Sequence, residues 1–272
     1  MPFAENDGTK IYWDAQGSGA PVLLIMGLGW PSSSWYRTRP ILSDHYRTVA
    51  FDNRGVGQSD APPGPYSIAQ MAADAAAVLQ AAGVNAAHIL GVSMGGMIAQ
   101  EFALRYPKKV RSLMLGCTAA GGSRAVQAKP EVIQVLMSRG VNPEMFAAAL
   151  NPFIYDAGTP RSRMDEDLQM RRKWFPTPDA YFAQLQAIIG WEAYSRIAQI
   201  EAPTVVIHGE NDRLVPLENA KLIAERIPGA KLVMIPNASH IFNTDQTEAA
   251  HAAILEFLAA QATRKHERPM PV

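Results

Sequence analysis

Short apolar runs recur along the chain, and segments with helical periodicity separate them. Six of these runs are almost continuously apolar, as strands buried on both faces of a parallel sheet are. They lie within 21–27, 46–52, 88–92, 110–117, 203–209 and 231–237. An earlier stretch, KIYWDAQG at 10–17, instead alternates apolar and polar residues, which is typical of a strand with one exposed face.

The periodicity of the intervening segments predicts helices. They lie at 32–44, 67–83, 94–106, 217–229 and 247–261. The clearest of them begins at Ser67 and ends at Gly83, residue types that favour the two ends of a helix. Strands that alternate with helices predict an α/β fold, with a mostly parallel sheet covered by helices on both faces.

One long segment departs from this alternation. Residues 121–200 contain no convincing buried strand, but they contain several helical stretches and scattered aromatic residues. We therefore expect an α/β core from 1–120 and 201–263, with a helical cap formed by 121–200. The polar, proline-containing residues 264–272 are expected to be a frayed, disordered tail.

Composition narrows the class of protein. The chain has 272 residues with 25 basic and 25 acidic side chains, so its formal net charge is zero and neither nucleic acid nor a membrane is an expected partner. The single cysteine, Cys117, cannot close an internal disulfide, and the polar start MPFAENDGTK does not resemble a signal peptide. No apolar run reaches the roughly 20 residues of a membrane span. The sequence therefore indicates a cytoplasmic protein and leaves its oligomeric state open.

Ser93 is the candidate nucleophile. It lies in GVSMG, between the predicted strand at 88–92 and the predicted helix at 94–106. A Gly-x-Ser-x-Gly sequence in this context forms a sharp turn that projects the serine hydroxyl above the sheet. The same turn places the serine at a helix N-terminus, where developing negative charge is favoured.

A serine hydroxyl needs a histidine base, and the histidine needs an acid to orient it. In this topology the order along the chain is serine, acid, histidine, each just after a strand. Asp212 and His240 satisfy that order, and Glu210 in the same loop is an alternative acid. We interpret Asp245 as the N-cap of the last helix rather than as the acid.

The other histidines fit the role of base less well. His88 begins a strand and His208 lies within one, so both are predicted to be structural. His45 ends an early helix, His251 lies inside the last helix and His266 lies in the tail.

Two backbone amides are candidates for an oxyanion hole. One is that of Met94, which directly follows the nucleophile, and the other belongs to the loop MGLGW after an earlier strand. In that loop we select Leu28, which follows the flexible Gly27. Only the amide is used, so the side chain at either position is unconstrained.

Together the motifs resemble the α/β-hydrolase superfamily. They are MGLGW, FDNRGVGQSD, GVSMGGMIAQEFALRYPKKVRSLML, HGENDRLVP and PNASHIF. The most similar branches are serine esterases, enol-lactonases and cofactor-free perhydrolases. The resemblance implies an eight-stranded, mostly parallel sheet, a triad of Ser93, Asp212 and His240, and an acyl-enzyme mechanism without a cofactor.

The chain departs from some branches of that superfamily. Met26 stands where many relatives have a histidine, which affects the side-chain hydrogen bonds of the oxyanion loop but not its amide. A serine nucleophile argues against haloalkane dehalogenases and epoxide hydrolases, and Val92 argues against carbon–carbon hydrolases. Asp52 and Arg54 in DNRGVGQSD are interpreted as a buried bracing pair.

We expect hydrolysis of a carboxylic ester or a lactone through an acyl-enzyme on Ser93. A perhydrolase or haloperoxidase activity and a 3-oxoadipate enol-lactonase-like activity are alternatives. A non-catalytic ligand receptor on the same fold is a further, less favoured alternative.

The cap is expected to select the substrate. Trp30, Met94, Trp174 and Trp191 are candidates for an apolar pocket, although ordinary cap packing explains each tryptophan as well. The basic residues at 161–173 would suit a substrate carboxylate, but a solvated helix face is the favoured interpretation. Arg161, Arg163, Arg171, Arg172 and Lys173 make up this set. We therefore expect uncharged esters of modest size.

Overall fold

A central sheet of eight strands organises the computed structural model, which describes residues 2–140 and 142–264. Their order across the sheet is β1-β2-β4-β3-β5-β6-β7-β8. The pairs β1–β2 and β2–β4 are antiparallel and all later pairs are parallel, which confirms the predicted fold class. The strands are β1 (Phe3–Asn6), β2 (Thr9–Gln16), β3 (Pro21–Ile25), β4 (Arg47–Phe51), β5 (Ala87–Val92), β6 (Val110–Gly116), β7 (Thr204–Gly209) and β8 (Lys231–Ile235).

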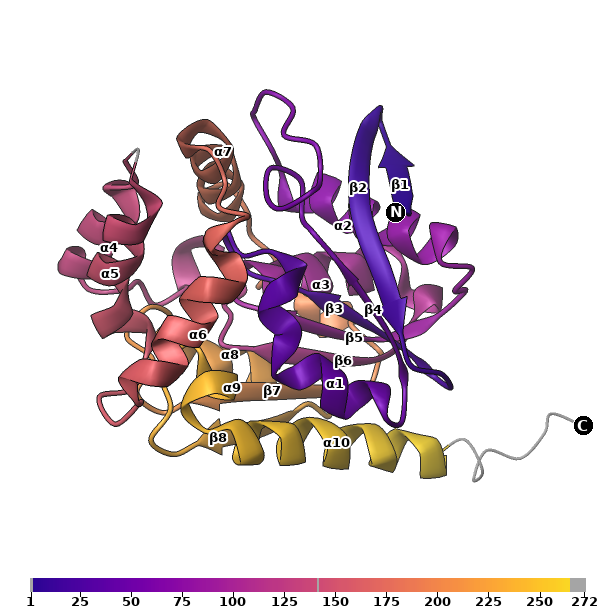
Figure 1. Ribbon diagram of the computed structural model, residues 1–272. Coiled ribbons are helices and arrows are strands. Elements are labelled where there is room, and N and C mark those ends of the chain that lie inside the picture. Colours follow the sequence, from indigo (N-terminus) through magenta and orange to yellow (C-terminus); the bar gives the residue numbers. More distant parts are fainter. Residues whose placement is uncertain (1, 141, 265–272) are drawn as a thin grey trace, which may run out of the picture.

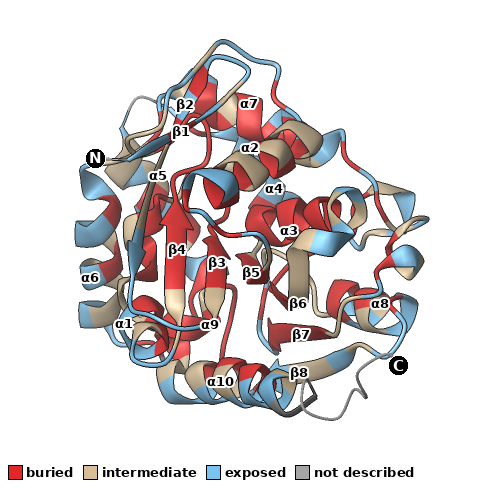
Figure 2. Ribbon diagram, turned by 90° about the vertical axis from the view of Figure 1, so that its right-hand side faces the viewer, coloured by how far each residue is buried: buried red, intermediate tan, exposed pale blue. Residues whose placement is uncertain are grey.

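Helices cover both faces of this sheet (Figure 1). One face carries α2 (Ile68–Ala81), α3 (Met94–Arg105) and α8 (Glu218–Arg226). The other carries α1 (Thr38–Ser43) and α10 (Thr247–Arg264). The central strands and the inward sides of the helices are buried, whereas the outer sides of the helices are exposed (Figure 2).

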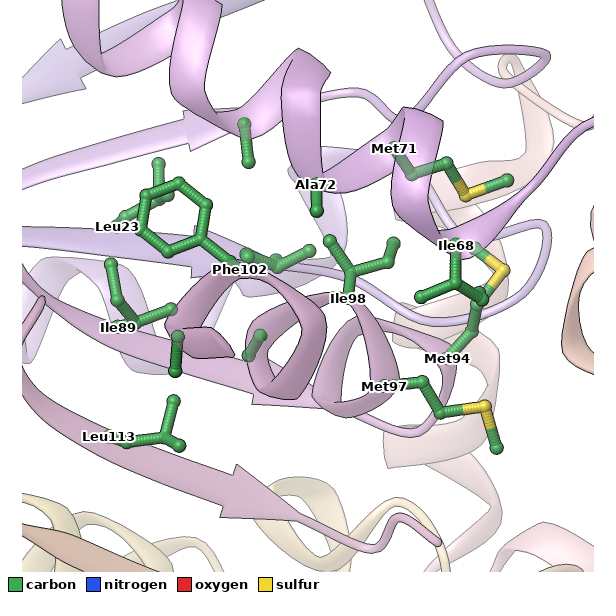
Figure 3. Close-up of a cluster of buried hydrophobic side chains, with 14 of the residues drawn as sticks. Leu23, Ile68, Met71, Ala72, Ile89, Met94, Met97, Ile98, Phe102 and Leu113 are labelled. Carbon is green, nitrogen blue, oxygen red and sulfur yellow. The ribbon is translucent and has the colours of Figure 1, made fainter. Parts of the chain in front are cut away.

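Successive residues of the central strands pack on opposite faces, which explains their continuous apolar runs. In β3, Leu23 belongs to the cluster under α2 and α3, whereas Val22 and Leu24 belong to the cluster under α1 and α10. Figure 3 shows Leu23 beside Phe102 of α3, with Ile98 of the same helix closer to Ala72 of α2. Burial of each such aliphatic or aromatic side chain stabilises the fold by about 1.5–3 kcal/mol. The packing on both faces of the sheet therefore fixes the positions of the central strands.

The helix predicted over 32–44 is divided. A 3-10 helix, η1 (Ser32–Tyr36), precedes α1, and Pro40 lies in the first turn of α1. Proline has no backbone N–H to donate, so it is tolerated in the first turn of a helix but not in the middle of a longer one.

Between β6 and β7 the chain is helical, as predicted. It forms α4 (Pro130–Met137), α5 (Pro143–Ile154), α6 (Arg161–Arg172) and α7 (Pro178–Ile189). Figure 1 shows these helices gathered at one end of the sheet. In the described part of this segment, the only extended pairing is the isolated bridge between Gly121 and Glu192. The boundaries of a separate cap at 121 and 200 stay a prediction.

Asp52 and Arg54 are both buried, but they do not pair with each other as expected. Arg54 makes two hydrogen bonds to Asp74 of α2, at 2.7 and 2.6 Å. Asp52 instead accepts the backbone amides of Ser32 at 2.6 Å and Gln58 at 2.8 Å. The two side chains therefore brace the loop after β4 in different directions, toward α2 and toward η1.

The described chain ends at Arg264. The predicted tail, 264–272, and with it His266, lies outside the described residues except for Arg264, the last residue of α10. Within the described residues, no helix is both long and apolar enough to span a membrane.

Candidate active site

Ser93 occupies the sharp turn between β5 and α3 that the sequence predicted. Its φ of 56° and ψ of −124° are rare for a residue with a side chain. The turn is held because the Ser93 amide donates to the Gly116 carbonyl at 2.8 Å and the Thr118 hydroxyl donates to the Ser93 carbonyl at 2.7 Å. A Cβ atom at Gly95 would lie 2.2 Å from the Ile25 carbonyl oxygen, so only glycine lets α3 start this close to β3.

His240 and Asp212 lie together after β8 and β7. The Nδ1 atom of His240 is 2.8 Å from Oδ2 of Asp212, and both side chains are buried. The other oxygen, Oδ1, accepts the amides of Leu214 at 2.9 Å and Val215 at 2.8 Å. With Nδ1 donating to the carboxylate, Nε2 of His240 is the ring nitrogen left to accept a proton.

The charge on Asp212 is stabilised despite its burial. Burial by itself raises the pKa of this carboxyl, but the charge and hydrogen bond of His240 and the nearby His208 outweigh it. The net result is a pKa below the ordinary value, so Asp212 is ionised at neutral pH. His208 is fully buried and its Nε2 bonds the Val215 carbonyl at 2.8 Å, as expected of a structural histidine.

The alternative acids lie elsewhere. Glu210 is exposed, and no contact joins it to His240 among the described residues. Asp245 is not the N-cap of α10, because it is the last residue of the short helix α9 (Phe242–Asp245). Its carboxylate instead accepts the Ser239 amide at 2.7 Å and the Thr159 hydroxyl at 2.6 Å. The N-cap prediction is wrong because the carboxylate accepts hydrogen bonds from buried donors on neighbouring segments instead.

Cys117, Asp212 and His240 bring potential metal-ligating atoms within 4.8 Å of one another. Burial raises the pKa of the Cys117 thiol well above its ordinary value, and the Asp212 charge adds to this. A protonated thiol is a poor metal ligand, since the thiolate is the form that binds metals. The oxygens of Asp212 are also occupied by the hydrogen bonds described above, so the cluster suits proton transfer better than metal binding.

Leu28 and Met94, the two candidates for the oxyanion hole, line a common cavity with Ser93. Within the described part of the chain, neither amide donates to another protein group. The adjacent Gly29 amide donates to the side chain of Gln184 at 2.8 Å, and the Gln184 amide group donates to the Arg54 carbonyl at 2.7 Å. Gln184 lies on α7 and is fully buried, so it ties the Leu28 loop to the helical segment. Nothing in the sequence singled out Gln184.

One cavity contains Ser93 and His240. Its volume is about 70 Å³, and most of its wall is apolar. Besides Ser93, His240, Leu28 and Trp30, it is lined by residues that the sequence did not assign to the site, among them Arg139, Phe146, Leu150, Phe175 and Tyr181. The wall therefore combines residues from α4–α7 and the segments beside them with residues from the loops that follow the core strands.

A second cavity of about 300 Å³ also reaches Ser93 and Leu28. It includes Met94, one of the candidates for an apolar pocket, together with apolar residues of α4 and α7. These are Ile133, Leu136, Met137, Leu185, Ile188 and Ile189. Three of them, Ile133, Met137 and Ile189, are exposed on the surface, so this cavity has an apolar rim.

Two of the predicted pocket tryptophans lie elsewhere. Trp191 is buried against the core and its indole donates to Glu101 at 3.0 Å, whereas Trp174 lines neither of the two cavities that reach Ser93. Packing therefore explains Trp191, and Trp30 is the predicted tryptophan that reaches the cavity.

The basic run 161–173 is not uniformly solvated. Arg161, Arg172 and Lys173 are exposed, and Arg163 bonds backbone carbonyls, but Arg171 is buried and lines the cavity with Ser93. The expectation of a solvated face is therefore wrong at Arg171. Because α6 packs against the Trp30 loop, one residue of the run turns inward.

Comparisons with known proteins agree with this fold. Residues 20–246 match the family described as alpha/beta hydrolase fold. The poly(3-hydroxyalkanoate) depolymerase of Ectopseudomonas oleovorans is 33% identical over 256 residues, covering 92% of this chain and 88% of that protein. RutD of Azorhizobium caulinodans, named for carbamate hydrolysis, is 30% identical over 267 residues, covering 94% of this chain and 98% of that protein.

A solved structure extends the comparison to three dimensions. The enol-lactonase from Burkholderia xenovorans is 27% identical, has a TM-score of 0.82, and covers 95% of this chain and 100% of its own. The chain therefore belongs to the α/β-hydrolase family, as its motifs indicated, and it is a hydrolase.

Proposed function

We propose that the protein is a serine hydrolase that cleaves carboxylic esters, lactones included, through an acyl-enzyme on Ser93. The observation that carries the proposal is the placement of Ser93 and His240 on one apolar cavity, with His240 2.8 Å from the buried Asp212. The similarity to a polyester depolymerase and to an enol-lactonase supports the same reaction class.

The first half of the reaction forms the acyl-enzyme. Nε2 of His240 removes the proton from the Ser93 hydroxyl as its oxygen attacks the ester carbonyl. The amides of Leu28 and Met94 donate to the resulting oxyanion, and they can do so because no protein acceptor occupies them in the described chain. His240 then gives its proton to the leaving alcohol as the carbon–oxygen bond breaks.

The second half releases the acid. His240 removes a proton from a water molecule, the hydroxide attacks the acyl carbonyl, and the same two amides hold the second oxyanion. Collapse returns the proton to Ser93 and frees the carboxylic acid. Asp212 keeps the ring oriented and offsets its positive charge in both halves, which its depressed pKa allows near neutral pH.

The two cavities that meet at Ser93 would hold the two halves of the substrate. The larger one, about 300 Å³ with an exposed apolar rim, suits an extended apolar group. The smaller one, about 70 Å³, suits a short chain. Both walls depend on α4–α7, so we propose that these helices act as the cap that selects the substrate.

The test is ester and lactone hydrolysis by the wild-type protein and by Ser93→Ala. We expect the variant to lose at least roughly a thousandfold in kcat while its melting temperature stays near that of the wild type. Near-wild-type turnover in Ser93→Ala would overturn the proposal. A parallel assay with hydrogen peroxide, a carboxylic acid and halide distinguishes ester hydrolysis from peracid chemistry.

A further inference from the structure

Arg171 is a buried cation without an acidic partner of its own. It is 4% exposed and lies near the end of α6. Among the described residues, its guanidinium donates no hydrogen bond and has no carboxylate oxygen within 4.0 Å, and its Nε atom is buried without a partner. Burial lowers the pKa of this guanidinium, opposed by Tyr155 and Asp167, but arginine remains protonated at neutral pH. A buried charge with unused donors is costly unless a ligand satisfies it.

Aromatic rings fix the position of this guanidinium. Its central carbon lies 4.1 Å from the ring centroid of Trp30 and 5.5 Å from that of Phe175. Cation–π contacts of this kind offset part of the cost of burial and hold the guanidinium plane, but they leave its N–H donors free. Trp30, Phe175 and Arg171 all line the cavity that contains Ser93 and His240.

Asp167 lines the same cavity, but its carboxylate oxygens already have other partners. Its oxygens accept the hydroxyls of Tyr36 at 2.7 Å, Tyr155 at 2.9 Å and Thr244 at 2.8 Å. It also lies 3.5 Å from Nε of Arg37. Asp167 therefore has little capacity left to act as the partner of Arg171.

A second buried guanidinium faces the cavity. Arg139 is 6% exposed, and its donors go to the neutral backbone carbonyls of Gly140 and Pro176, the latter at 2.9 Å. No carboxylate lies within ion-pair distance of Arg139 in the described chain. The cavity wall thus holds two guanidiniums and one occupied carboxylate, so its charge favours an anion.

Resting on the proposed function, we infer that the substrate carries a free carboxylate, which Arg171 binds by charge-assisted hydrogen bonds while Ser93 attacks an ester or lactone carbonyl of the same molecule. A guanidinium presents paired N–H groups that match the two oxygens of a carboxylate. The positive wall of Arg139 adds to the attraction. This reverses the preference for uncharged esters that the sequence suggested.

The test compares substrates that match in length and differ in charge. Monoethyl adipate and ethyl hexanoate carry the difference on the acyl side, and the acetate ester of ω-hydroxyhexanoate and hexyl acetate carry it on the alcohol side. We expect a higher kcat/KM for the anionic member of one pair. In Arg171→Met that preference falls roughly tenfold to a hundredfold, mainly through KM, since hydrogen bonds to charged groups contribute about 1.5–3 kcal/mol each.

Arg172→Met is the matched control. Arg172 is the next residue on α6, but it is exposed and pairs with Glu144 on the surface. We expect this variant to keep the wild-type preference in both pairs. Arg171→Lys keeps the charge but loses the paired donors, so an intermediate preference is expected. Equal kcat/KM for the charged and neutral members in the wild type would overturn the inference.

Binding is measured separately, so that failure of the proposed function is distinguishable. All four compounds are added to Ser93→Ala. The anionic member of one pair is expected to raise the melting temperature more than its neutral member, and the difference disappears in the Ser93→Ala/Arg171→Met double variant. Selective stabilisation without Ser93-dependent hydrolysis would sustain the anion site and reject the hydrolase scheme. Ser93-dependent hydrolysis without selective stabilisation would reject the anion site alone.

Discussion

Ser93, the proposed nucleophile, depends on several local contacts for its backbone conformation. Its φ of 56° is unfavourable for a residue with a Cβ atom, at a cost of order 1–3 kcal/mol, and the surrounding bonds must supply that energy. The Gly116 carbonyl and the Thr118 hydroxyl hold its backbone, and glycine at 95 gives α3 room to begin. The strained turn aims the hydroxyl at the cavity instead of at the sheet.

Gln184 is the residue whose removal tests the support of the oxyanion loop. Gln184→Met loses the bond from the Gly29 amide and the bond to the Arg54 carbonyl. We expect kcat to fall roughly tenfold with KM little changed, because the Leu28 amide next to Gly29 loses its fixed position. Gln186→Met on the exposed side of α7 is the control and should keep wild-type kcat. An equal loss in both variants would contradict the positioning role.

At the scale of elements, Asp245 fastens the loop that carries His240 to the segment after α5. It accepts the amides of Ser239 at 2.7 Å and Asp156 at 3.2 Å, and the hydroxyl of Thr159 at 2.6 Å. Burial raises the pKa of Asp245 to about 6, although these hydrogen bonds oppose the rise. The ionised carboxylate is therefore less favourable in the folded protein than in the unfolded chain.

This shift predicts a pH dependence of stability. A carboxyl whose pKa is raised by folding stabilises the fold below its unfolded pKa, and that contribution is lost as the pH rises through its folded pKa. We expect the free energy of unfolding of the wild-type protein to fall by about 3 kcal/mol, relative to that of Asp245→Asn, as the pH rises from about 4 to about 7. Urea unfolding of both proteins across that range measures the difference. If the wild type instead became more stable relative to Asp245→Asn as the pH rises, the pKa of Asp245 could not be raised by folding.

At the scale of the whole molecule, the loop after β4 joins the sheet, α2 and the helices between β6 and β7. Arg54 bonds Asp74 of α2 through its side chain and Gln184 of α7 through its carbonyl. The Gly57 amide donates to the Trp174 carbonyl at 3.4 Å. The DNRGVGQSD motif therefore stabilises the arrangement of parts far apart in the chain.

Breaking the Arg54–Asp74 pair should destabilise the whole protein. Arg54→Met leaves the Asp74 carboxylate buried without its cation, which typically costs about 3–5 kcal/mol. Arg161→Met breaks a pair with Asp165 on the exposed face of α6 and should cost less than about 1 kcal/mol. The free energy of unfolding in urea measures both. Similar losses of unfolding free energy in the two variants would show that the buried Arg54–Asp74 pair contributes no more to stability than an exposed pair.

The sequence by itself determined the fold class and selected the candidates for the reactive centre. The apolar runs predicted the parallel strands because a strand buried on both faces cannot be polar at alternate positions. Ser93, Asp212 and His240 were selected because each directly follows a strand, and the carboxyl ends of parallel strands meet at one edge of a sheet. These inferences depend on local patterns and chain order, both of which are written in the sequence.

Only the tertiary structure decided what surrounds that centre. The contact of Gln184 with Gly29, the pairing of Arg54 with Asp74 and the bond from Thr159 to Asp245 join residues that lie from 20 to 155 positions apart along the chain. The inward turn of Arg171 depends on how α6 packs against Trp30, whereas Arg172 and Lys173, which follow it in the same basic run, are exposed to solvent. Helical periodicity fixes which residues share a face, but the packing partner decides which face is buried, and that choice sets the charge of the cavity.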